Sequence, residues 1–164
     1  MTHKKHINEI TAGNDSDSYV ISNYLLSTFE DIILLNAWGE NSFFYNPSNA
    51  SPRGTYFCTI KEKDGDNDKA SELYRSNIFR FNFGVSKKTF ADLFGNIPKR
   101  PAKGSVIDYD CDFSQVDILQ PHPIYGWMCW VAILNPTKET FDELKILLEE
   151  RYRLVLMKHQ KKLV

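Results

Sequence analysis

The sequence predicts an α+β fold in which a single, mainly antiparallel sheet of about five to six strands is covered by helices. Three patterns predict this fold. Residues 78–85 alternate in polarity, which is typical of a strand. Residues 127–134 are apolar at every position, which indicates a central strand covered on both faces. Residues 137–160 carry apolar side chains at helical spacing, so a long C-terminal helix can pack on the sheet.

Length and composition fit one domain with a packed core. The chain has 164 residues, of which 42% are hydrophobic, and this excludes a disordered protein. We expect residues 1–15 to form a flexible N-terminal arm and residues 16–164 to form a single α+β domain. The formal net charge is -1, so only a local patch could attract nucleic acid or an anionic membrane.

The cysteines indicate a reducing compartment. They are three in number and widely spaced, without a C-x-x-C pair, and Cys58 and Cys129 stand in apolar runs typical of reduced core thiols. No apolar stretch approaches the roughly 20 residues of a membrane span. We therefore expect a cytoplasmic protein without a membrane partner, a metal or another cofactor. The acidic loop 63–68 lacks the glycine and glutamate spacing of a calcium loop.

A helix and three strands are expected in the first part of the chain. Asp15 and Ser16 offer N-caps for a helix near 17–28, where apolar residues keep helical spacing. The spacing then changes to short apolar runs bounded by polar residues. These runs predict strands at 31–36, 42–45 and 56–60.

The strand at 78–85 has one aromatic and one polar face. The aromatic face must belong to the core, and it contains Phe79, Phe81, Phe83 and Val85. The opposite face looks toward solvent or a cleft, and it contains Ile78, Arg80, Asn82 and Gly84.

Two further helices complete the pattern. Ser86 caps a short middle helix at 87–94, which Gly95 ends. The long helix starts either with Asn135 as N-cap and Pro136 at its first position, or with Thr137 as N-cap. Its apolar stripe consists of Phe141, Leu144, Leu148, Tyr152 and Val155.

Several segments carry a family resemblance. Residues 37–47 contain Ala-Trp-Gly and then Phe-Phe-Tyr-Asn-Pro, and residues 80–95 contain Arg-Phe-Asn-Phe-Gly-Val before the short helix. Residues 121–136 contain Pro-His-Pro-Ile-Tyr-Gly-Trp-Met and Trp-Val-Ala-Ile-Leu-Asn-Pro. Together they resemble an uncharacterised, mainly bacterial family, number 6194 among the domains of unknown function. That resemblance implies no reaction.

The order of elements is also similar to that of the MmcQ/YjbR-like domains. Those domains have a frataxin-like α+β fold and are suspected of binding DNA, so this likeness implies a possible nucleic-acid partner. The basic loop residues Lys99, Arg100 and Lys103 would touch phosphates in that case. The alternative is an ordinary solvated loop.

Candidate ligand contacts lie on the Arg80/Asn82 face of the predicted strand and near His122 and Tyr125. Two prolines hold His122 in an extended frame, where it can act as acid, base or ligand, or bond a neighbouring loop. Arg80 and Asn82 share a strand face, which can clamp a carboxylate or phosphate or remain a solvated, ion-paired face.

Aromatic residues offer stacking surfaces or core packing; they are Trp38, Tyr125, Trp127 and Trp130. On a strand, Trp127 and Trp130 face opposite sides, whereas Tyr125 and Trp127 can line one pocket. Cys129 is a poor nucleophile because its apolar run raises the pKa of the thiol.

Three functions follow from these residues. The leading hypothesis is a non-enzymatic module that binds a small molecule or a protein through Arg80, Asn82, His122, Tyr125 and Trp127. The second is a DNA-binding protein of the MmcQ/YjbR-like type. The third is an enzyme that uses His122 as an acid or base beside a carboxylate such as Asp117.

Overall fold

The computed structural model describes residues 17–37, 39–49 and 52–162. In these residues one antiparallel sheet has six strands in the order β1-β2-β3-β4-β6-β5, and three α-helices accompany it. The predicted α+β fold class is therefore confirmed. Trp38 and the predicted arm 1–15 lie outside the described residues. The strands are β1 Ile32–Ala37, β2 Glu40–Tyr45, β3 Thr55–Lys61, β4 Arg80–Gly84, β5 Gln120–Pro121 and β6 Trp130–Leu134.

The helices are α2 Ser18–Thr28, α3 Lys87–Phe94 and α4 Lys138–Lys162. Asp17 caps α2 by accepting the N–H of Val20 at 2.8 Å, so the predicted caps Asp15 and Ser16 are wrong. Asp17 takes this role because it stands directly before the first helical residue. The predicted middle helix and its cap Ser86 are confirmed.

Of the two predicted starts of the long helix, the one at Thr137 is correct. Its hydroxyl accepts the N–H of Thr140 at 3.1 Å. None of the helices in the described part of the chain combines the length and the apolar character that crossing a membrane requires.

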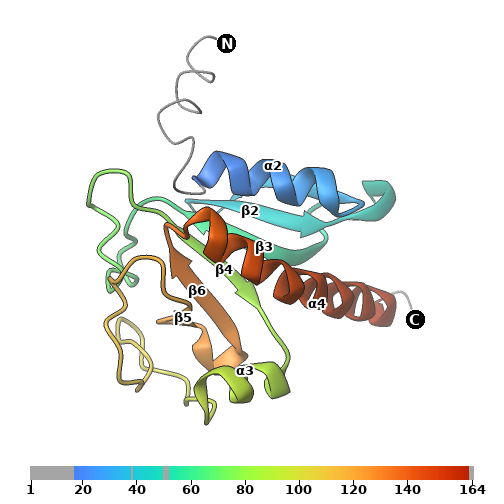
Figure 1. Cartoon of the computed structure of the whole chain (residues 1–164). Coiled ribbons are helices and arrows are strands. Elements are labelled where there is room, and N and C mark those ends of the chain that lie inside the picture. The colour runs from blue at the N-terminus through green and yellow to red at the C-terminus, as the bar shows by residue number, and fades with distance from the viewer. Residues whose placement is uncertain (1–16, 38, 50–51, 163–164) are drawn as a thin grey trace.

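All three helices contribute to a core on one face of the sheet, with α4 crossing in front of β3 and β4 (Figure 1). The core contains Ile21 and Leu25 of α2 and Phe90 of α3. It also joins Phe81 and Phe83 of β4, with the flanking residues Phe79 and Val85, to Phe141, Leu144, Leu148 and Val155 of α4. The predicted packing of the α4 stripe on the aromatic strand face is therefore confirmed.

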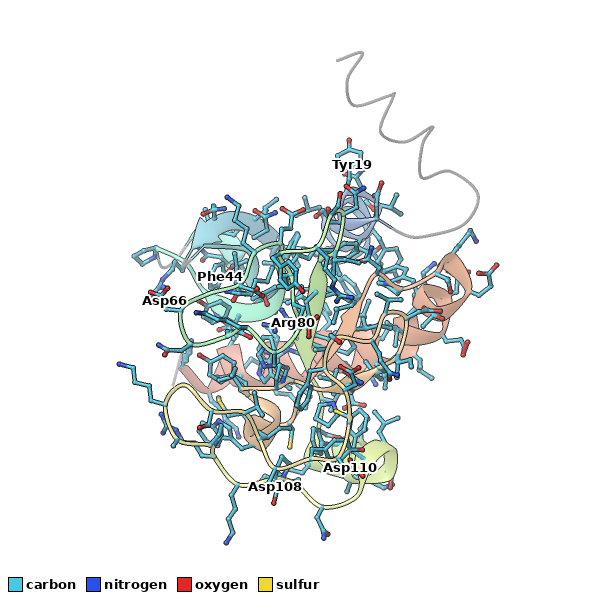
Figure 2. The ribbon with its side chains drawn as sticks, turned by 90° about the vertical axis from the view of Figure 1, so that its left-hand side faces the viewer. Tyr19, Phe44, Asp66, Arg80, Asp108 and Asp110 are labelled. Atoms are coloured by element: carbon cyan, nitrogen blue, oxygen red, sulfur yellow. The ribbon has the colours of Figure 1, made fainter. Side chains whose placement is uncertain are left out.

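The opposite face of the sheet is covered by irregular segments. One is the β3–β4 connection, and the other runs from α3 to β6. Figure 2 looks onto this side, with Arg80 in the middle, Asp66 on the first segment, and Asp108 and Asp110 on the second. Arg75 Nη2 joins the two segments by donating to the carbonyl oxygen of Ser114 at 2.9 Å.

The predicted strand at 127–134 begins later than expected. Gly126–Met128 forms a 3-10 turn, and Cys129 has a left-handed φ of 65°. The turn closes because the N–H groups of Met128 and Cys129 bond back to Tyr125 and Gly126. β6 therefore starts at Trp130, and the strand alternation that placed Tyr125 and Trp127 on one face does not apply.

Candidate ligand-binding cavity

Arg80 is fully buried on the loop-covered face and fastens the β3–β4 connection to the sheet. Its Nη1 and Nη2 donate to the two carboxylate oxygens of Asp68 at 2.9 and 2.6 Å, and Nη1 also donates to Ser71 Oγ at 2.9 Å. Burial opposes the charge of Asp68, but the hydrogen bonds and the charge of Arg80 outweigh it and lower the pKa of the carboxyl.

Asn82 extends this network toward β3. Its Oδ1 accepts from Arg80 Nε at 2.8 Å, and its Nδ2 donates to Thr59 Oγ1 at 3.0 Å. Arg80 and Asn82 are both 0% exposed, so the expectation that they face solvent or a cleft is wrong. The irregular connection supplies partners that a strand pattern alone does not reveal, and the guanidinium is held by protein groups.

His122 lies against the same guanidinium. The backbone N–H of His122 donates to the Trp130 carbonyl oxygen at 2.9 Å, which aligns His122 with the start of β6. Nδ1 accepts the N–H groups of Ile124 and Tyr125, each at 3.0 Å. Nε2 lies 3.3 Å from Arg80 Nη2.

The environment keeps this imidazole neutral. Burial is the largest cause that lowers the pKa of His122 well below its ordinary value, followed by the charge of Arg80. Lys61 acts in the same direction, and Asp68 acts in the opposite one. His122 is therefore uncharged at neutral pH.

A cavity of about 270 Å³ lies beside this network. The sheet contributes Glu40, Ser42, Tyr56, Thr59 and Trp130 to its lining, and the segment before β6 contributes His122, Tyr125 and Met128. Tyr125 and Met128 are 48% and 52% exposed, which makes this segment accessible from solvent. The volume lies just below the roughly 300 Å³ at which typical ligand pockets begin, so the cavity suits a small molecule.

A β-bulge turns Tyr56 toward the cavity. The β2–β3 register shifts so that Phe43 pairs with Cys58 while Phe44 pairs with Tyr56. Phe57 and Cys58 consequently both belong to the core, and Tyr56 lies on the cavity side with Thr59. A strictly alternating strand would place Tyr56 on the same face as Cys58.

Arg151 of α4 supports two cavity residues from behind. Its Nε and Nη2 donate to the carbonyl oxygens of Phe57 and Tyr56, both at 2.9 Å, where β3 extends beyond its last pair with β4. Its Cζ lies 5.0 Å from the centre of the Trp130 ring. Arg151 was not among the predicted site residues, although an arginine three positions after Leu148 and four before Val155 falls on the apolar stripe.

The structure brings only some of the predicted site residues together. Tyr125 joins His122 at the cavity, with ring centres 5.1 Å apart. Trp127 is not among the lining residues, and the Arg100 guanidinium lies 4.9 Å from the centre of its ring. Lys99, Arg100 and Lys103 are exposed on the α3–β5 connection.

Two further carboxylates have structural partners. Asp117 Oδ1 accepts the N–H of Thr137 at 2.8 Å and so serves the start of α4. Asp64 Oδ1 accepts the N–H of Leu73 at 2.9 Å. The described residues contain no group of three or more His, Cys, Asp or Glu arranged to hold a metal ion.

The lining residues that sequence analysis missed come mainly from β2 and β3. Glu40, Ser42 and Thr59 reach the cavity because the β2–β3–β4–β6 pairing aligns strands far apart in the chain. Glu40 also lies 3.7 Å from Lys61 Nζ, which balances its charge. The sequence contained one sign of these residues, namely that the polar residues Glu40 and Ser42 stand at alternate positions of β2 and so share one face.

A family model described as "Family of unknown function (DUF6194)" matches residues 17–164 of the chain. The match covers the sheet, all three helices and the cavity. No curated protein and no solved structure matches the chain. The likeness to MmcQ/YjbR-like domains therefore stays a prediction.

Proposed function

We propose that this protein, which belongs to the family of unknown function DUF6194, is a non-enzymatic module that binds a small molecule in the cavity beside His122. One observation carries this proposal. The cavity has aromatic walls and a few polar groups, and it rests on a buried hydrogen-bond network that holds its lining in place. Rigid, largely apolar concavities with few polar groups are the usual form of small-molecule sites.

The chemistry of the lining supports binding more than catalysis. The imidazole of His122 is neutral and its Nδ1 already accepts two backbone N–H groups. Burial raises the pKa of the Cys129 thiol, with a smaller opposite effect of Lys87, so a thiolate nucleophile is suppressed. Asp117, the carboxylate expected beside His122 in an enzyme, serves α4 instead.

The basic residues of the α3–β5 connection would bind nucleic acid in the alternative function. Lys99, Arg100 and Lys103 are exposed, but Arg100 covers the ring of Trp127 and thereby occupies an aromatic surface that a base would need. Free thiols at the buried Cys58 and Cys129 support a cytoplasmic location.

Thermal-shift screening of a metabolite library tests the binding proposal, because a ligand of the native state raises Tm in a concentration-dependent way. Met128→Ala removes an exposed side chain from the cavity, and Met157→Ala removes a similarly exposed one from α4 as a matched control. A true cavity ligand loses affinity for Met128→Ala alone. A hit that both variants bind like the native protein contradicts the site.

A gel-shift series with duplex DNA at low salt tests the alternative. Retention of DNA that is lost with Lys99→Ala and Lys103→Ala, without any cavity hit, would favour the nucleic-acid function.

A further inference from the structure

The hydrogen bonds of His122 decide which ring nitrogen carries its hydrogen. A neutral imidazole has one N–H and one acceptor nitrogen. With Nδ1 as the acceptor, the ring receives the N–H groups of Ile124 and Tyr125, both at 3.0 Å. With Nε2 as the acceptor, it receives only Arg80 Nη2 at 3.3 Å, and an N–H on Nδ1 would point at two other N–H groups. The first arrangement satisfies more donors.

The second nitrogen of the ring is therefore a donor. Nε2–H then lies 3.3 Å from Arg80 Nη2, which is also a donor, so two N–H groups converge at one place without accepting from each other. Arg80 cannot turn away, because Asp68, Ser71 and Asn82 hold the rest of its guanidinium. An oxygen atom placed beside Nε2 would accept its hydrogen.

Nδ1 is turned to the backbone of Ile124 and Tyr125, which leaves Nε2 as the ring nitrogen available to a molecule in the cavity. The His122 ring lines the cavity, whereas Arg80 is fully buried behind. Tyr56 and Tyr125 supply aromatic surfaces in the same cavity, and these suit a planar group.

We propose that the cavity recognises a small planar compound through a carbonyl or carboxylate oxygen that accepts from His122 Nε2–H, a donor held in place by the bonds of Nδ1 to the backbone of Ile124 and Tyr125. The inference rests on the proposed function and adds the ligand class to it. The site discriminates by hydrogen bonding, because a ligand without the oxygen leaves a buried donor unpaired.

Three probe compounds test the inference on the full-length protein by NMR titration. Acetophenone and benzoate carry the oxygen on a ring, and α-methylstyrene has the shape of acetophenone with a CH₂ group in place of the oxygen. We expect acetophenone or benzoate to bind at least about fivefold more tightly than α-methylstyrene, the ratio that an unpaired buried donor implies. The two oxygen compounds distinguish a neutral carbonyl from an anion.

Two substitutions separate the roles of the two ring nitrogens. In His122→Asn the amide oxygen can replace Nδ1 and keep the bonds to Ile124 and Tyr125, but no donor reaches the position of Nε2. In His122→Gln the amide nitrogen can replace Nε2. We expect the preference for the oxygen compounds to vanish in His122→Asn and to persist in His122→Gln.

The tautomer is measured independently of any ligand. Long-range ¹H–¹⁵N spectra distinguish the two neutral forms, and His122 is assigned by its loss in the His122→Asn variant. A hydrogen on Nδ1 overturns the inference. Equal binding of all three compounds in the cavity overturns it as well but leaves the binding function intact. No binding of any of them overturns the proposed ligand class, whereas the library screen decides on the binding function itself.

Discussion

Asp68 and Arg80 form a bidentate ion pair, with hydrogen bonds of 2.6 and 2.9 Å, between a loop carboxylate and the guanidinium of a strand residue that is 0% exposed. This pair ties the β3–β4 connection to the sheet next to the cavity. The connection has no regular hydrogen-bond ladder of its own, so its position depends on such side-chain contacts.

Replacing Asp68 by Ala should lower the free energy of unfolding by about 3 kcal/mol, because it leaves the buried Arg80 charge without its partner. Urea denaturation measures the loss. Asp66→Ala changes an exposed carboxylate on the same segment and serves as control, with an expected change within about 0.5 kcal/mol. Equal losses for both variants would show that the ion pair contributes no specific stability.

His122 should make the protein less stable in mild acid. Its folded pKa lies well below the ordinary value, so the unfolded chain takes up the proton first as the pH falls below about 6.5. The free energy of unfolding should then decrease with a slope of up to about 1.4 kcal/mol per pH unit until the folded pKa is reached. Above this range the residue is neutral in both states and contributes no pH dependence.

Urea denaturation between pH 7.5 and 5 checks this expectation, with His122→Asn as the variant that cannot titrate. Asp68 interferes little, because its folded pKa is lowered and the unfolded carboxyl, with an ordinary pKa of about 3.9, takes up protons mainly below about pH 5. An identical pH slope for the native protein and His122→Asn would contradict the prediction.

Gly84 and Arg151 should be energetically coupled. A Cβ atom at Gly84 would lie 2.6 Å from Arg151 Nη1, so Gly84→Ala forces the guanidinium to move. Arg151→Ala loses two hydrogen bonds to β3 carbonyls and should cost about 2–3 kcal/mol. Once this side chain is absent, the added methyl group meets less resistance.

A double-mutant cycle measures this coupling by urea denaturation. The double variant should be more stable than the sum of the single losses predicts, by about 1 kcal/mol or more. Strict additivity would mean that the two residues do not compete for the same space.

Thr137→Ala should destabilise the start of α4 by about 1 kcal/mol, because the N–H of Thr140 loses the hydroxyl that accepts it. Thr137→Ser keeps this hydroxyl and should stay close to the native stability. Thermal or urea unfolding of the two variants distinguishes the loss of the cap from a general effect of the position.

The helices and strands could be predicted because their signals are local. Apolar and polar residues alternate around Phe81, and apolar residues recur at helical spacing around Leu148. Both patterns correctly identified the side chains that face the core. The cap at Ser86 and the glycine at 95 likewise act within one helix. The turn at Gly126–Met128 was missed because its apolar composition also fits a buried strand.

The cavity depends on contacts between distant parts of the chain. Arg80 and His122 are 42 positions apart, yet their side-chain nitrogens lie 3.3 Å apart because β4 pairs with β6 and the chain returns along β5. The bulge at Phe57 then decides that Tyr56 faces the cavity. Neither the register nor the bulge follows from a residue's nearest neighbours.

By itself the sequence determined the fold class, the family and the apolar face of the sheet, because the periodic spacing of apolar residues along the chain shows which side chains are buried. Only the tertiary structure decided that Arg80 and Asn82 are buried anchors and that His122 faces the cavity. The reason is that irregular segments cover the second face, and their path is set by specific side-chain contacts that have no period to detect.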